Sequence, residues 1–305
     1  MSAVDFSSLC PSKPLSLVVS AVDADSFKLE SNLKQGEKIM NESTQVKDST
    51  AQIEPMSFWK ALLYFGLPAL LFRIFLYNGT PMLIRLGLKP FEANVVSFTI
   101  PAAILFALAF GFYKRDGYPI SWGDIKTRFR LLPMTGKDWL WAIGGFIVTF
   151  FSIGALAGTA LMLIKAFPAI APPDFFPPWL KPGVNLDTAL FADYIGVPLK
   201  NNWGVAILFI VMLFFNIAGE ELWWRGYILP RQEKTHGRWT WLIHGLLWLF
   251  WHVAFYPWQI FALLPICLVL PYIAQQRQNT WVAFIIHLQN AIVLILILAM
   301  IFGAM

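Results

Sequence analysis

The fold of this chain can be inferred from one stretch, WGVAILFIVMLFFNIAGEELWWRGY, which spans residues 203–227. No charged side chain occurs from Trp203 to Gly219, a length that carries a helix across most of the ~30 Å hydrocarbon core of a bilayer. Two adjacent acids and a base, Glu220, Glu221 and Arg225, then follow. An ionisable residue at mid-bilayer costs about 2.5–3.5 kcal/mol on insertion scales. The stretch therefore predicts a transmembrane helix with a functional site in it.

The composition of the whole chain agrees with this prediction. Of 305 residues, 57% are hydrophobic and only 13% are charged, whereas about a quarter are charged in soluble domains. The two cysteines, Cys10 and Cys267, are too few for a disulfide framework or a cysteine zinc site. The net charge of +5 is spread over the connections, without a basic patch that alternates with aromatic residues. We therefore expect a lipid bilayer as the surroundings of the protein and no nucleic acid partner.

Seven apolar segments follow the start of the hydrophobic part of the chain, each about 18–27 residues long. We expect them to be helices, since only a helix or a closed barrel satisfies its backbone within a bilayer and no segment alternates with period two. The predicted fold is an all-α polytopic membrane helix bundle with about seven transmembrane helices. The predicted spans are 58–77, 92–113, 139–164, 203–229, 239–256, 258–275 and 280–303.

The first 56 residues differ in composition from the rest of the chain. They hold eight acids and five lysines, are rich in serine, and show no helical or strand periodicity. A basic region followed by an apolar run, as in a secretory signal, does not occur there. We expect residues 1–56 to be a disordered polar tail and residues 57–305 to be a transmembrane helical domain, whose functional core lies at 200–300.

The distribution of Lys and Arg among the connections predicts the orientation. One set of alternate connections holds fifteen of these residues and the other set holds five, by count on the sequence. We expect an integral multi-pass protein of the cell membrane with a cytoplasmic N-terminus and an outer C-terminus. The basic segment 114–138 is either an interfacial helix or a solvated loop. The proline-rich segment 165–202 is expected to be a long irregular outer loop.

Two histidines lie at the depth of Glu220 in the predicted helices. At ~1.5 Å per helical residue, Glu220, His252 and His287 lie about 16, 20 and 12 Å from the cytoplasmic ends of their helices. Asn290 lies one turn from His287 on the same face. We therefore expect these four side chains to share one site, in a cavity that faces the cytoplasm.

The two adjacent acids are expected to have different roles. Glu221 precedes Arg225 by four residues, the favourable order for an ion pair along a helix. Glu220 is rotated by about 100° from Glu221 and has no evident local partner. We therefore expect Glu220 to be available for chemistry while Arg225 neutralises Glu221.

Carboxylate and imidazole groups in this arrangement suit the hydrolysis of a peptide bond. Glu220 can accept a proton from water while His252 holds that water. His287 and Asn290 can donate hydrogen bonds to the oxyanion that forms on the carbonyl. Alternatively, Glu220, His252 and His287 bind a zinc ion that acidifies the same water. No HExxH sequence occurs, which excludes a zincin-type site.

Three short motifs resemble those of a known family. The run 219–227 resembles the EExxxR motif of the CPBP family, which comprises the CAAX prenyl endopeptidases and their bacteriocin-processing (Abi) relatives. The run 248–252 resembles the FxxxH motif, with Trp248 in place of Phe. The run 287–291 resembles the HxxxN motif, with Asn290 one position earlier than the family's asparagine. The matching part covers about a third of the chain, roughly residues 200–300.

This resemblance implies an intramembrane endopeptidase, a hydrolase of either the metalloprotease or the glutamate protease type. Glu220 would be the general base, His252 would help to activate water, and Glu221 with Arg225 would orient the site. His287 would be an oxyanion donor or a metal ligand. The implied catalytic residues are Glu220, Glu221, Arg225, His252, His287 and Asn290, and the residues for a metal, if one binds, are Glu220, His252 and His287.

The substrate and two other functions stay open at this point. A peptide, a membrane protein or a prenylated chain end would suit such a cavity, and no cofactor is expected beyond a possible zinc ion. A non-catalytic relative, such as a bacteriocin immunity factor, is one alternative. A proton-coupled transporter is the other, because buried Glu and His also form proton relays. The sequence shows no internal repeat of the kind that transporters carry, and it does not indicate the oligomeric state.

Overall fold

The computed structural model describes residues 53–184 and 187–303, and every regular element in this part of the chain is helical. The all-α fold predicted from the sequence is thus confirmed. The expected tail at 1–56 lies outside the described residues except for its last four. Of these, Met56 is fully buried and its backbone N–H donates to the carbonyl of Arg231 at 3.1 Å.

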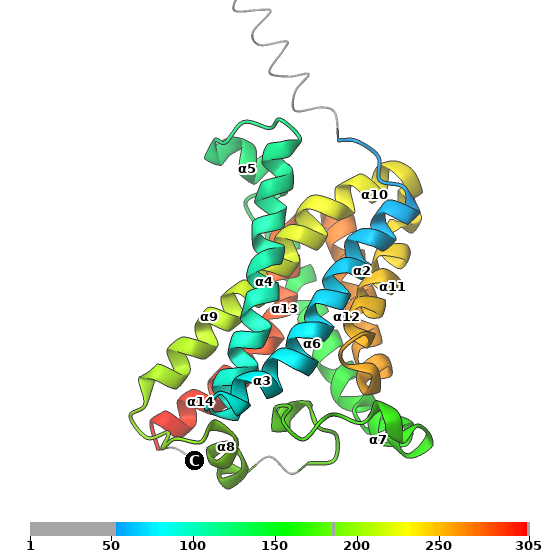
Figure 1. Cartoon of the computed structure of the whole chain (residues 1–305). Helices are drawn as coiled ribbons and strands as arrows, with labels where there is room; N and C mark the ends of the chain where they lie inside the picture. Colours follow the sequence, from blue (N-terminus) through cyan, green and yellow to red (C-terminus); the bar gives the residue numbers. More distant parts are fainter. Residues whose placement is uncertain (1–52, 185–186, 304–305) are drawn as a thin grey trace, which may run out of the picture. The chain divides into compact units, whose positions relative to one another are not determined.

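Six helices of the described part are long and apolar enough to cross a membrane, close to the seven expected. The difference arises from Trp203–Val253, a helical stretch of 51 residues that contains two of the expected spans. The chain reverses within it at Gly237, whose φ of 54° is a left-handed conformation that favours glycine. Figure 1 shows the two arms on either side of α10. The parts are α9 (Trp203–Glu220), η4 (Glu221–Ile228), α10 (Leu229–His236), η5 (Gly237–Trp239) and α11 (Thr240–Val253).

The other long helices pack around these two arms. The first half of the chain supplies α2 (Phe58–Ile74), η1 (Phe75–Gly79), α3 (Thr80–Arg85), α4 (Pro90–Arg115) and α6 (Gly136–Leu156). The second half supplies η6 (Pro257–Gln259), α12 (Ile260–Arg277), α13 (Thr280–His287), η7 (Leu288–Ala291) and α14 (Ile292–Ile301).

Aromatic side chains fill much of the core, which is unusual because tryptophan is seldom completely buried. The rings stack closely on one another: those of Phe65 and Trp224 are 4.2 Å apart and nearly parallel. Burial of such large apolar faces and their mutual contacts stabilise the arrangement of the helices. Five tryptophans are almost fully buried, namely Trp223, Trp224, Trp248, Trp251 and Trp258.

Two pairs of helices cross at glycines, where the backbones come too close for any other residue. A Cβ on Gly219 of α9 would lie 2.5 Å from the carbonyl oxygen of Ala102 in α4. A Cβ on Gly245 of α11 would lie 2.3 Å from the carbonyl oxygen of Cys267 in α12. Small residues allow such close approach in membrane helix bundles, so these two crossings fix the relative positions of four helices.

The connections hold more regular structure than the sequence predicted. The basic segment 114–138 contains a short helix, α5 (Trp122–Arg128), whose Trp122 is 65% exposed. The segment 165–202 follows α7 (Gly158–Ala166) and contains η2 (Pro168–Ile170), η3 (Pro178–Leu180) and α8 (Thr188–Ile195). The expectation of an irregular loop was therefore wrong for α8. This helix has ordinary end signals, since Asp187 caps its first turn and Gly196, with a φ of 72°, ends it.

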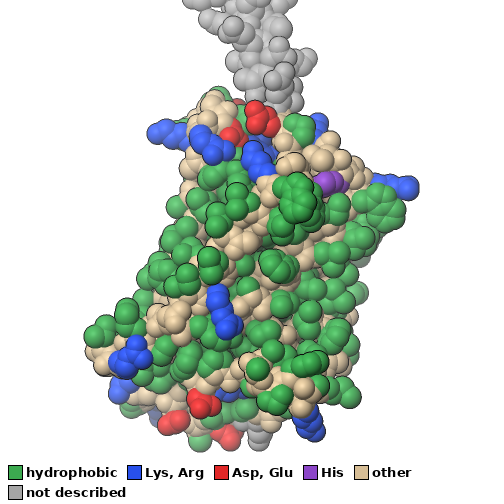
Figure 2. Space-filling model, turned by 45° about the vertical axis from the view of Figure 1, so that its right-hand side comes forward, with side chains coloured by type: hydrophobic (Ala, Val, Ile, Leu, Met, Phe, Trp, Pro, Cys, Tyr) green, Lys and Arg blue, Asp and Glu red, His purple; other side chains and the backbone are tan. Residues whose placement is uncertain are grey.

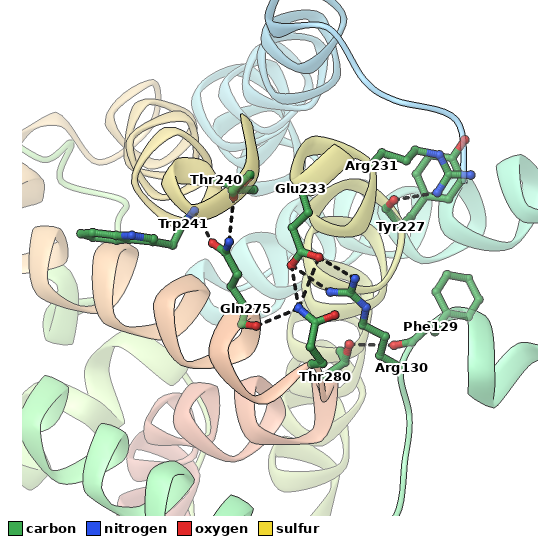
Figure 3. A network of polar contacts seen from close by, with 11 residues as sticks. Phe129, Arg130, Tyr227, Arg231, Glu233, Thr240, Trp241, Gln275 and Thr280 are labelled. Carbon is green, nitrogen blue, oxygen red and sulfur yellow. Dashed lines mark hydrogen bonds and ion pairs between the residues drawn. The ribbon is translucent and has the colours of Figure 1, made fainter. Parts of the chain in front are cut away.

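Figure 2 shows hydrophobic side chains over the middle of the molecule and most charged side chains near its two ends. At the end that carries α10, Glu233 joins two connections. Its carboxylate accepts two hydrogen bonds from Arg130, at 3.0 and 2.6 Å, and another from Gln278 at 3.1 Å (Figure 3). Thr280 donates its hydroxyl to the carbonyl of Phe129 at 2.7 Å. These bonds tie the segment after α5 to the start of α13.

Candidate active site

The two adjacent acids lie where α9 changes into η4, a π-helical segment of eight residues. Such segments are rare and are often found at functional sites. The expected ion pair is present, because Nη1 of Arg225 lies 3.2 Å from Oε1 of Glu221 and neither side chain is exposed. The guanidinium group also lies 3.6 Å from the centre of the Trp248 ring, a cation–π contact. Arg225 thus has both a counterion and an aromatic partner.

Glu220 differs from expectation, because it has two hydrogen-bond partners. Nδ2 of Asn216 donates to Oε1 at 2.6 Å, and Nε1 of Trp248 donates to Oε2 at 3.0 Å. Asn216 is a neutral partner, so a pattern of charges does not indicate it, although it lies four residues earlier on the same helical face. Trp248 stands where the family motif has Phe, but its indole N–H is a donor that Phe lacks.

His252 lies on α11, one helical turn after Trp248. Its Nδ1 is 3.0 Å from the backbone carbonyl of Trp248 and 3.8 Å from Sγ of Cys267. A carbonyl oxygen can only accept, so Nδ1 carries the hydrogen, and Nε2 of the neutral ring is an acceptor. His252 can therefore accept a hydrogen bond from water.

His287 is the last residue of α13 and contacts the second acid rather than the first. Its Nδ1 lies 2.8 Å from Oε1 of Glu221. The ring of Trp248 is 5.0 Å from that of His252 and 5.7 Å from that of His287, both edge to face. The same indole thus contacts both histidines as well as Glu220 and Arg225.

Asn290 lies in η7, a 3₁₀ segment that starts directly after His287. In 3₁₀ geometry, residues i and i+3 are aligned on one side of the helix. The local winding therefore brings Asn290 into line with His287 although the spacing is one shorter than in the family motif. Nδ2 of Asn290 donates to Oδ1 of Asn216 at 3.0 Å.

A cavity of about 910 Å³ adjoins these side chains, near the upper end of the range for small-molecule sites. Four of the six candidate residues line it, namely Glu220, His252, His287 and Asn290. Glu221 and Arg225 are completely buried and support the cavity residues from behind. The structure therefore brings the predicted residues together as a lining set and a supporting pair.

The direction of the cavity differs from expectation. It extends from Glu220 toward the end of the bundle that carries α7 and η3, where Leu161, Trp179 and Lys181 line it. The basic segments 114–138 and 230–238 lie at the opposite end, with α5 and α10 (Figure 1). The depth of the site was estimated from helix length alone, which does not indicate the side from which the site is reached. At this far end, burial raises the pKa of Tyr256, so its hydroxyl stays neutral.

The candidate zinc ligands are not arranged as a metal site. Within residues 53–184 and 187–303, no group of three or more His, Cys, Asp or Glu side chains could hold a metal ion. Both oxygens of Glu220 already accept hydrogen bonds from protein donors. As they stand, Glu220, His252 and His287 do not fit a three-ligand zinc centre.

Comparison with protein families agrees with the motifs. The family described as "Type II CAAX prenyl endopeptidase Rce1-like" matches residues 202–293, a range that includes all six candidate residues. The match confirms the resemblance to the CPBP and CAAX protease family and, together with the six apolar helices, supports a multi-pass membrane protein. At the level of the family it supports a CAAX-type intramembrane protease. None of the curated proteins and none of the solved structures compared with the chain matches it.

Proposed function

We propose that this protein is an intramembrane endopeptidase that hydrolyses a peptide bond in a membrane-associated or prenylated substrate. The observation that carries the proposal is the position of Glu220 in the cavity wall. Its carboxylate is held at both oxygens by neutral donors, and His252 and His287 line the same cavity. A carboxylate without a cationic partner of its own is costly in these surroundings, which favours a catalytic role.

The water is held by two acceptors in this mechanism. It donates one hydrogen to Glu220 and the other to Nε2 of His252, so that a lone pair on its oxygen is directed at the substrate carbonyl. Glu220 takes a proton as the oxygen–carbon bond forms. The same proton then passes to the nitrogen of the cleaved peptide bond as that bond breaks, and this step regenerates the carboxylate.

In the tetrahedral intermediate the carbonyl oxygen becomes an oxyanion, which needs hydrogen-bond donors on the side of the carbonyl group away from the attacking water. A His287 ring that is protonated on both nitrogens donates from Nε2 to the oxyanion while Nδ1 donates to Glu221. Arg225 completes this group by pairing with the same carboxylate. Glu221 and Arg225 therefore orient His287, and they do not touch the substrate.

A cleavage assay with purified protein tests the proposal. The probe is a quenched fluorogenic peptide that ends in a farnesylated Cys-aliphatic-aliphatic-X sequence, presented in detergent micelles and in vesicles. We expect cleavage by the native protein and none by Glu220→Gln, with unchanged thermal unfolding. Glu92→Gln, at a half-buried acid in the first turn of α4, is the control and should cleave normally. Full activity in Glu220→Gln, His252→Ala and His287→Ala would overturn the proposal.

A further inference from the structure

We propose that Asn216 is a positioning residue for Glu220, and that Asn290 acts on Glu220 through Asn216 rather than as an oxyanion donor. The inference rests on the proposed function, because it concerns the group that activates water. Asn216 lies outside all three motifs that predicted the site.

The three side chains form one directed chain of hydrogen bonds. Asn290 donates from Nδ2 to Oδ1 of Asn216 at 3.0 Å, and Asn216 donates from Nδ2 to Oε1 of Glu220 at 2.6 Å. Asn216 is 5% exposed and Glu220 is 1% exposed. Hydrogen bonds in a chain of this kind polarise one another, and the last one ends on a carboxylate, the stronger type of acceptor.

Asn216 fixes a torsion that would otherwise be loose. The terminal torsion of a glutamate has a broad, roughly two-fold preference. Trp248 anchors only Oε2 of Glu220, and Asn216 supplies the second anchor at Oε1. With both anchors, the plane of the carboxylate is fixed relative to the cavity. Without Asn216, the carboxylate can rotate about its bond to Trp248, and the water that it holds moves with it.

The chain of hydrogen bonds also explains why Asn290, which follows His287 by three residues rather than four, can serve this site. The 3₁₀ winding of η7 aligns Asn290 with His287, and the donor group of Asn290 is engaged by α9. The amide of Asn290 thereby joins the last motif to Glu220 in the first. This role needs no direct contact between Asn290 and the substrate.

Stabilisation of the contact between helices does not by itself account for this chain of hydrogen bonds. The Asn290–Asn216 bond links η7 to α9, and bonds of this type between membrane helices contribute little to stability. The second bond, from Asn216 to Glu220, lies within one helix and joins no further element. A purely structural pair has no use for it, whereas a positioning residue does.

Two variants separate the functions of the Asn216 amide. Asn216→Leu keeps the approximate size and removes both bonds. Asn216→Asp keeps the shape and an acceptor for Asn290, but it cannot donate to an ionised Glu220. We expect kcat to fall by about 10²-fold in both, the typical effect of a small misplacement of a catalytic group, while KM changes less than about threefold. Asn202→Leu is the matched control, because Asn202 precedes the same helix and its side chain bonds only locally, to the carbonyl of Pro198.

A double-mutant cycle tests the route through Asn216. Asn290→Ala should lower kcat in the native background and have no further effect in Asn216→Leu. Equal effects in both backgrounds would overturn the route and assign Asn290 to the oxyanion. A normal kcat in both Asn216→Leu and Asn216→Asp would overturn the positioning role. A loss of kcat/KM that comes from a raised KM as much as from a lowered kcat would overturn it too.

A second cycle keeps the inference testable if the farnesylated peptide is not cleaved. Thermal unfolding of Asn216→Leu, Glu220→Gln and the double variant measures the coupling of this pair without any substrate. Non-additive shifts in Tm without cleavage would reject the proposed function and retain the hydrogen-bond chain. Additive shifts in Tm would reject the hydrogen-bond chain even if the protein cleaves the peptide.

Discussion

Nδ1 of His287 lies 2.8 Å from Oε1 of Glu221, although 66 residues separate them in the chain. The same oxygen contacts Nη1 of Arg225 at 3.2 Å. One completely buried carboxylate therefore orients a cavity-lining imidazole and neutralises a guanidinium at the same time. Because Glu221 and Arg225 are completely buried, their charged groups depend on protein partners rather than on bulk water.

Removal of Arg225, the cation of the buried ion pair, should destabilise the protein strongly. Arg225→Ala leaves Glu221 as a buried charge that has lost its cationic partner, and such changes cost about 3–5 kcal/mol. We expect a clear decrease in Tm, measured by differential scanning fluorimetry in detergent. Arg85→Ala is the matched control, since Arg85 ends α3 and is exposed. An unchanged Tm for Arg225→Ala would show that the pair does not contribute to stability.

Replacement of both partners should separate stability from activity. In Glu221→Leu/Arg225→Leu no charge is left unpaired, and apolar replacements of buried ion pairs are often neutral or stabilising. We expect a Tm above that of Arg225→Ala, together with loss of cleavage, because His287 is no longer oriented. An active double variant would show that the pair is only a structural clamp.

The close contact at Gly219 predicts a large effect of a single methyl group. Gly219→Ala places a Cβ 2.5 Å from a backbone oxygen of α4, which cannot move aside as a side chain can. We expect a destabilisation of about 1–3 kcal/mol or more and reduced cleavage, because Glu220 is the next residue. Gly144→Ala is the control, since its Cβ would meet no atom within 4 Å, and helix propensity favours alanine there by about 0.5–1 kcal/mol. Equal Tm values for the two variants would contradict the described crossing of α9 and α4.

The network around Glu233 predicts a local loosening when its charge is removed. Glu233→Gln loses the two-pronged bond with Arg130 and weakens the bond with Gln278. Both of these partners have left-handed backbones, with φ values of 54° and 52°, so they need tertiary support. We expect a loss of about 1–3 kcal/mol and faster hydrogen exchange at residues 129–132. Unchanged exchange there would show that other contacts hold the segment.

Metal removal is expected to leave activity unchanged, because Glu220, His252 and His287 are not arranged as zinc ligands. Purified protein treated with EDTA and 1,10-phenanthroline should cleave at the untreated rate, and elemental analysis should find less than one metal ion per chain. Loss of cleavage that zinc restores would instead assign these three residues to a metal centre.

Much of the fold follows from hydropathy and much of the site from motif spacing. The apolar spans, the Glu221–Arg225 pair and the shared cavity of Glu220, His252 and His287 were all predicted. They were predictable because helix length and the i, i+4 relation are local properties. The exception was the count of spans, since the two arms around Gly237 form one helical stretch.

The partners of Glu220 were not predictable in the same way. Trp248 reaches it from another helix, and the motif specifies an aromatic ring at this position rather than a hydrogen-bond donor. Asn216 is within reach of the i−4 relation, but a neutral amide gives no charge signal that distinguishes it from other residues of the helix. The direction of the cavity depends on how the helix ends are packed, which no local pattern encodes.

The helix crossings at Gly219 and Gly245 make one part of the cavity wall more rigid than the rest. Gly219 directly precedes Glu220, and Gly245 lies two turns before His252, so these close backbone contacts adjoin the helical segments that hold Glu220 and His252. Another part of the wall, at the end of α6 and along α7, contains Phe151, which is 69% exposed, and Leu161, which is 40% exposed. We therefore expect room for a bulky chain to be gained along α7 rather than at the crossings next to Glu220 and His252. In the proposed endopeptidase, tolerance of different substrates and precision of attack would then reside in different helices.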